Sequence, residues 1–95
     1  KDCMFSKGIH IATTDSHSVI SLESGQRINP SQNIVIGNHV WLGYCVNINK
    51  GVVIESDCIV ASHSVVTKTI KSHSIAAGIP AKVVKNNITW NRIRI

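Results

Sequence analysis

The sequence is poor in several residue types whose abundance would mark other protein classes. It holds three cysteines, Cys3, Cys45 and Cys58, an odd number without a CxxC pair. This argues against a disulfide framework and a zinc ribbon, and it favours a reducing, cytoplasmic location. No apolar run is long enough to span a bilayer, so we expect no membrane span, and the first residues lack a signal-peptide pattern.

Aromatic residues and, in the second half, acidic residues are also scarce. The four aromatic residues are not interleaved with basic ones, which disfavours a protein that stacks nucleic-acid bases. No acidic residue follows Asp57, whereas lysine and arginine continue to Arg94. The net charge of +5 is therefore concentrated at the C-terminal end. It favours a phosphate-bearing partner, although a solvated surface would explain it too.

The 95 residues, 43% of them hydrophobic and 16% charged, suit one globular domain, and a period of six dominates 33–68. Branched aliphatic residues recur at the first position of each block, namely Ile36, Leu42, Ile48, Ile54, Val60 and Val66. Small or β-branched residues occupy the fifth position, namely Val40, Val46, Val52, Cys58 and Ser64. Six residues make one short strand and one corner, and three such units close a triangular coil. The residues at the first and fifth positions, Leu42 and Cys58 among them, are expected to face inward and to stack on those of the next coil. The period predicts an all-β, parallel β-helix.

The same period occurs at the start of the chain, where Phe5 and Ile11 take first positions. Because Lys1 falls inside a block, we expect further coils upstream. The pattern lapses over 18–29, which we interpret as a loop ejected from the coil, and such loops commonly carry function.

After Val66 the period fades. We expect a covering strand at 81–85, and a segment at 86–95 that packs over the coil end or along a neighbouring subunit. The predicted organisation is a β-helix domain at 1–78 and a C-terminal basic extension at 79–95.

The period, together with "TTDSH", "HVWLG" and "AGIPAKVVK", resembles the hexapeptide-repeat acyltransferases, in particular galactoside and maltose acetyltransferases and capsular or lipopolysaccharide O-acetyltransferases. The resemblance implies a left-handed β-helix, against the usual right-handed crossover. It also implies a homotrimer with active sites between subunits. The implied reaction moves an acetyl group from acetyl-CoA to a sugar hydroxyl of a saccharide or surface polysaccharide, and no metal is expected.

Such a reaction needs a base, because a sugar hydroxyl is a poor nucleophile, and histidine suits that role near neutral pH. Among five histidines, His17 ends "TTDSH" where the coil gives way to the loop. It also matches the catalytic histidine of the family, 24 residues before Trp41. His39 and His63 occupy fourth positions and are expected to be exposed corner residues, while His10 is expected to be structural or at the surface.

Other site residues follow from the resemblance or from their position. Trp41 matches the tryptophan that lines the site in the family, with packing at a trimer interface as its alternative role. Asp15 either orients His17 or forms a turn, and it is a candidate acceptor-binding residue with Arg27 in the loop. Tyr44 stands where galactoside acetyltransferases have a serine, so the oxyanion donor is either this phenol or a backbone N–H.

The resemblance also assigns a coenzyme A site. Ser62 and Thr67 match backbone-contacting positions. Three lysines match the basic positions near the phosphates, although some family members have arginines at the last two of them; these lysines are Lys68, Lys82 and Lys85.

Three alternatives remain open from the sequence. An N-acetyltransferase acting on an amino sugar nucleotide would share the base and the cofactor. A metal enzyme similar to the γ-class carbonic anhydrases could use the histidines, although no HxxxxH pair is present. A purely structural β-helix would explain the period but not the spacing of His17 and Trp41.

Overall fold

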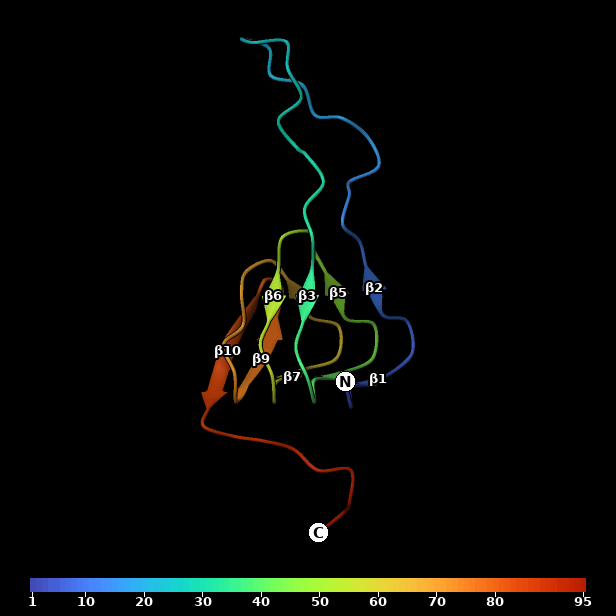
Figure 1. The fold of residues 1–95 in the computed structure, drawn as a ribbon, viewed down its shortest axis with the longest axis vertical. Helices are drawn as coiled ribbons and strands as arrows, with labels where there is room; N and C mark the ends of the chain where they lie inside the picture. The colour runs from blue at the N-terminus through green and yellow to red at the C-terminus, as the bar shows by residue number, and fades with distance from the viewer.

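A computed structural model describes residues 1–95 and contains strands but no helix. Its regular part is a stack of short strands, and one long arm projects from it (Figure 1). The strands are β1 (Met4–Phe5), β2 (His10–Ile11), β3 (Val35–Ile36), β4 (Trp41–Leu42), β5 (Asn47–Ile48), β6 (Val53–Ile54), β7 (Ile59–Val60), β8 (Val65–Val66), β9 (Ser74–Gly78) and β10 (Ala81–Asn86).

From β1 to β9, successive strands belong to different sheets, and the chain returns to the same sheet after three blocks. The sheets have the orders β1-β4-β7-β9-β10, β2-β5-β8 and β3-β6. Strands of the coil pair in parallel, so that Trp41 lies opposite Ile59 and Asn47 lies opposite Val65. Each pair is separated by one coil of three six-residue blocks. The predicted parallel coil of hexapeptide repeats is confirmed.

The core consists of the residues that the period placed inward. Leu42, Ile48 and Ile54, all at first positions, are completely buried. The fifth positions of the same blocks, from Val40 to Ser64, are buried as well. Because equivalent positions of successive coils stack on one another, each coil covers the apolar surface of the next.

The corners between strands depend on unusual backbone conformations. Fourth positions have positive φ, with 55° at His39, 79° at Gly51 and 61° at His63. Second-position glycines serve another purpose, since a Cβ on Gly43 would lie 2.7 Å from the backbone nitrogen of Ser62. Glycine there lets two coils stack closely. The expected corner positions of His39 and His63 are confirmed.

The arm leaves the coil after β2 and returns at β3. Its base is closed by the N–H of Gln32, which donates to the carbonyl of Thr13 at 3.0 Å. Further out, the N–H of Ile28 donates to the carbonyl of Val19 at 2.9 Å. Because residues 12–34 carry no named strand, the loop expected at 18–29 is part of a longer excursion.

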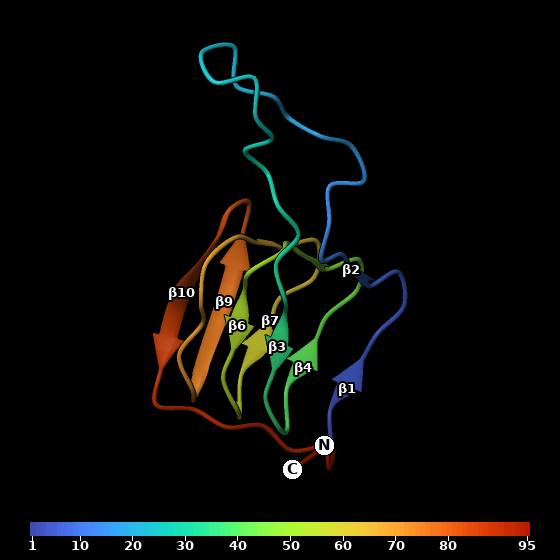
Figure 2. The same cartoon turned by 45° about the horizontal axis from the view of Figure 1, so that its top comes forward.

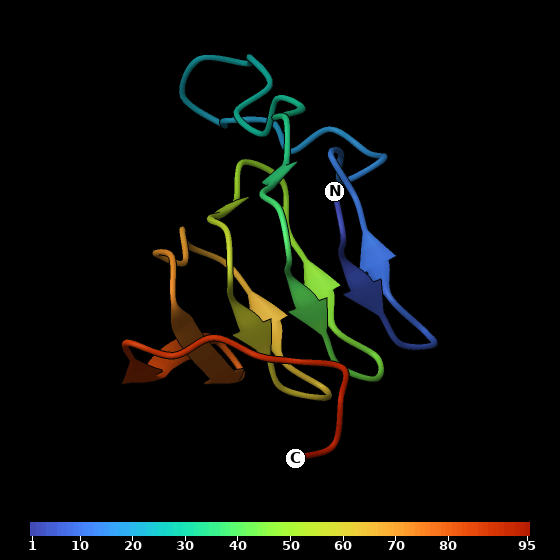
Figure 3. The same cartoon turned by 60° about the horizontal axis from the view of Figure 1, so that its bottom comes forward.

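The C-terminal residues cover a side of the coil. Strand β10 pairs antiparallel with β9, in agreement with the covering strand expected there. Beyond it, residues 87–92 form a strap that crosses successive coils (Figures 2 and 3). Ile88 donates its N–H to the carbonyl of His73, and Arg92 donates to the carboxylate of Asp2. These partners line one edge of its own coil, so the segment does not pack over the coil end; its packing along a neighbouring subunit stays a prediction.

Two leucines test the assigned core. Leu42 is completely buried, whereas Leu22 on the arm is fully exposed. We expect Leu42→Ala to lower the free energy of unfolding by about 2–5 kcal/mol, because it leaves a cavity between coils. Leu22→Ala should change it by less than about 0.5 kcal/mol. Chemical denaturation of both variants measures this, and equal losses would contradict the assigned core.

Candidate active site

His17 lies on the outgoing side of the arm, close to its base. Its N–H donates to the carbonyl of Asp15 at 2.8 Å, and its own carbonyl accepts from Nδ2 of Asn29 at 2.9 Å. The residue is exposed, and its imidazole makes no hydrogen bond within the chain. The backbone is therefore held while the ring stays accessible, which suits a base that must meet a substrate.

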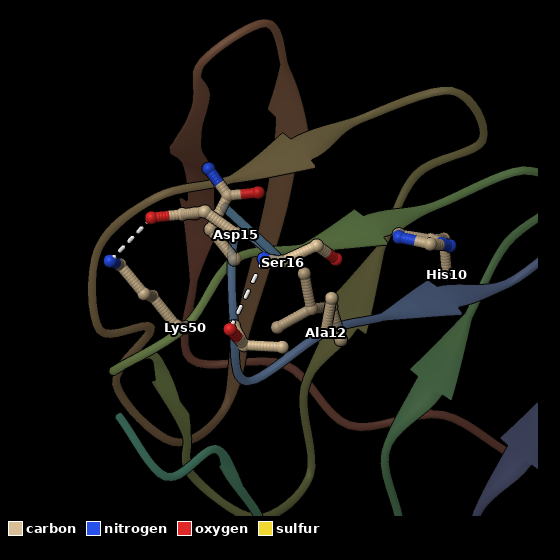
Figure 4. Close-up of a pocket in the computed structure, with 8 residues that line it drawn as sticks. His10, Ala12, Asp15, Ser16 and Lys50 are labelled. Carbon is tan, nitrogen blue, oxygen red and sulfur yellow. Dashed lines mark hydrogen bonds and ion pairs between the residues drawn. The ribbon is translucent and has the colours of Figure 1, made fainter. Parts of the chain in front are cut away.

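Asp15 connects the arm to the coil. Its Oδ2 accepts from Nζ of Lys50 at 2.6 Å (Figure 4). The same oxygen accepts from Nδ2 of Asn29 at 2.9 Å. The hydrogen bond from Lys50, followed by that from Asn29, holds the pKa of this carboxyl below its ordinary value. Asp15 thus remains ionised, and its side chain bonds to these two partners and not to the imidazole of His17.

A pocket of about 390 Å³ lies where the arm base meets the sheet of β2, β5 and β8. Asp15 and Lys50 lie close together in it, with His10 further along the pocket (Figure 4). The lining residues are His10, Ala12, Thr14, Asp15, Ser16, Ile48, Asn49 and Lys50.

Of the residues selected from the sequence, only Asp15 lines this pocket, and His17 follows the lining residue Ser16. Sequence reasoning missed Asn49 and Lys50 and treated His10 as structural or superficial. The signal that could have found Asn49 and Lys50 is the segment "NINKG", whose strand β5 pairs with β2, the strand that precedes the arm. The six-residue period alone does not mark this corner as functional.

Trp41 lies on a different sheet from the pocket. It belongs to β4, and the residue is 37% exposed. The centroid of its ring lies 6.0 Å from that of Trp90 in the strap. Trp90 also stacks on His39, with ring centroids 3.9 Å apart, and donates from Nε1 to the carbonyl of His39. His39 is a corner residue as expected, but it is not exposed, because Trp90 covers it.

His39 also contacts Asp57, whose carboxylate lies 2.8 Å from Nδ1 of the imidazole. This hydrogen bond is the main reason that the pKa of Asp57 lies below its ordinary value. Thr89 of the strap donates to the same carboxylate at 3.3 Å. An acidic corner residue thus joins a coil histidine to the strap.

Two of the expected cofactor residues meet at one corner. The N–H of Tyr44 donates to Oγ of Ser62 at 3.2 Å, and the ring of Tyr44 lies edge-on to His63. The neighbouring Cys45 side chain raises the pKa of the Tyr44 phenol. The phenol therefore keeps its proton at neutral pH and can donate a hydrogen bond.

The other expected cofactor residues are spread along the coil. Thr67 and Lys68 follow β8 and form the corner one coil beyond Asn49 and Lys50. Lys82 and Lys85 are exposed on β10, and every residue of this set can be reached by solvent. The chain contains no group of three His, Cys, Asp or Glu side chains placed to hold a metal ion. It also contains no helix suited to crossing a bilayer.

The coil of six-residue blocks and the histidine-bearing arm define a hexapeptide-repeat protein. Residues 33–68 match the family described as bacterial transferase hexapeptide (six repeats). The chain belongs to the hexapeptide-repeat acyltransferases, as its relatives also indicate. It is 50% identical over 93 residues to the polysialic acid O-acetyltransferase of Neisseria meningitidis, covering 97% of this chain and 43% of that protein.

Solved structures of acetyltransferases also resemble this chain. The polySia-specific acetyltransferase NeuO superposes with a TM-score of 0.94 at 39% identity, covering 97% of this chain and 43% of that one. A galactoside acetyltransferase in complex with coenzyme A superposes with a TM-score of 0.75 at 30% identity, covering 88% and 42%. The chain therefore spans less than half the length of these relatives.

The strap provides a test of how Trp41 is held. Trp90 is 7% exposed, and its ring stacks on His39 and contacts the guanidinium of Arg92. We expect Trp90→Ala to lower the free energy of unfolding by about 3 kcal/mol through lost packing. The emission of Trp41, then the sole tryptophan, should shift to longer wavelength. Fluorescence and denaturation measure both effects, with Ile93→Ala as an exposed control. An unchanged spectrum would show that Trp90 does not shield Trp41.

Proposed function

We propose that this chain transfers the acetyl group of acetyl-CoA to a sugar hydroxyl of an anionic surface polysaccharide of the polysialic acid type. The observation that carries the proposal is the 50% identity over 93 residues to a polysialic acid O-acetyltransferase. The net charge of +5 supports it, because a basic surface attracts an anionic polymer.

His17 acts as the general base in this proposal. Its imidazole takes the proton of the acceptor hydroxyl while the hydroxyl oxygen attacks the thioester carbon. A tetrahedral intermediate forms and collapses, the C–S bond breaks, and the proton held by His17 passes to the leaving thiolate. The exposed ring beside the pocket supports this role. The phenol of Tyr44 or a backbone N–H donates to the oxyanion.

Coenzyme A lies along the coil, and the solved galactoside acetyltransferase complex with coenzyme A supports this placement. Ser62 and Thr67 contact its amide-rich arm through their backbones. Three exposed lysines supply charge for its phosphates, namely Lys68, Lys82 and Lys85. The acceptor contacts the arm, where Arg27 is exposed and Asp15 borders the pocket.

The active enzyme in this proposal is a homotrimer of left-handed coils with sites between subunits. Two observations support it: His17 and Trp41 lie on different sides of one coil, and the Trp41 ring remains partly exposed. A site that uses both then takes Trp41 from a neighbouring subunit. We assign 1–78 to the catalytic coil and 79–95 to a basic extension. The three unpaired cysteines support a cytoplasmic location.

Replacing His17 tests the reaction. We expect His17→Ala to lower the rate of acetyl transfer by about 10²–10⁴-fold, because the hydroxyl loses its base. The control is His73→Ala, since His73 lies under the strap on another edge of the coil. The assay follows thiol release from acetyl-CoA and the mass of the product, with oligosialic acid and neutral oligosaccharides as acceptors. Equal activity of the wild type and His17→Ala would refute the base, and acetylation of neutral sugars alone would refute the acceptor class.

A further inference from the structure

The side chain of Asn29 joins both sides of the arm near its base. Its Nδ2 donates to Oδ2 of Asp15 and to the carbonyl of His17, each at 2.9 Å. Its Oδ1 accepts from the N–H of Val19 at 2.6 Å and from Nε of Arg27 at 3.1 Å. One amide thus uses its donors and its acceptor oxygen in four hydrogen bonds.

These bonds hold the backbone on both sides of His17. The carbonyl of His17 and the N–H of Val19 both bond to Asn29, and the N–H of His17 bonds to the carbonyl of Asp15. The imidazole makes no hydrogen bond of its own within the chain. The backbone therefore determines the direction in which the His17 side chain leaves the arm, and Asn29 determines the backbone.

Lys50 holds the same structure against the coil. Its Nζ donates to Oδ2 of Asp15 on the outgoing side of the arm and to the carbonyl of Pro30 on the returning side, the latter at 3.0 Å. The side chain of Lys50 is only 20% exposed. Gly51, the next residue, lies beneath Gln32, whose side chain would collide with a Cβ at that position. The corner that carries Lys50 is thus fitted closely to the arm.

We propose that Asn29 and Lys50 are positioning residues that place His17 for proton transfer. Asn29 fixes the backbone around His17, and Lys50 fixes the arm relative to the pocket through Asp15. The inference rests on the proposed role of His17 as base and adds two residues that make no direct contact with its ring. A displacement of about 1 Å at a reacting group can cost about 10²-fold in rate, so a rigid arm base is needed.

Four variants test the proposal. Asn29→Ala removes all four hydrogen bonds, and Asn29→Asp keeps the acceptor oxygen but loses both donors. Lys50→Met removes the charge at similar length, and Lys50→Arg restores a donor to Asp15. The control is Asn33→Ala, because Asn33 is exposed on the same arm and its side chain makes no hydrogen bond.

We expect Asn29→Ala, Asn29→Asp and Lys50→Met to lower kcat by about 10–10²-fold. For the two Asn29 variants the KM for acetyl-CoA should stay within about twofold, since Asn29 bonds to none of the residues assigned to coenzyme A. Lys50→Arg should recover part of the lost kcat. A wild-type kcat in Asn29→Ala, or an equal loss in Asn33→Ala, would overturn the proposal.

A second measurement separates this inference from the proposed function. Amide hydrogen exchange should accelerate at Val19 and His17 in Asn29→Ala and stay unchanged in Asn33→Ala. A wild-type protein that transfers no acetyl group would refute the proposed function, and the exchange rates would still decide whether Asn29 holds His17. Unchanged exchange at both amides would overturn the positioning role whatever the activity.

Discussion

The parallel pairing of strands one coil apart is the interaction on which the rest of this structure depends. Trp41 opposite Ile59, and Ile48 opposite Val66, fix the register of successive coils. Inward side chains then meet their own equivalents, and each strand of two residues is stable only because the coils above and below cover it. The close approach at Gly43 and the positive φ of the corners are consequences of this stacking.

The arm and the strap use the coil as a rigid support. The arm interrupts the period after β2, and its base is bonded to the corner of Lys50 through Asp15. The strap binds a different corner through His39 and Asp57. Both additions attach at corners, where side chains point outward and are free to bond. Loops on rigid scaffolds commonly carry function for this reason.

The sequence was sufficient to predict the coil, because a residue's position in the six-residue period indicates whether its side chain points inward. Leu42 and Cys58 were placed in the core from their block positions alone, and both are buried. It was insufficient for His39, since the residue that covers it, Trp90, lies 51 positions later. It was also insufficient for the arm base, where Asn29 and Lys50 act through outward side chains that no repeat pattern specifies.

The spacing of His17 and Trp41 in the sequence does not bring their side chains together within one chain. The 23 residues between them, 18–40, include the greater part of the arm and the strand β3, so the chain passes from one side of the coil to another before it reaches β4. The two residues therefore lie on different sides of one coil. In the homotrimer that we propose, this arrangement would put the two residues on opposite walls of an intersubunit site. The partly exposed ring of Trp41 lies beside Trp90 of its own chain, which leaves one side of the ring free for the contact that this proposal needs.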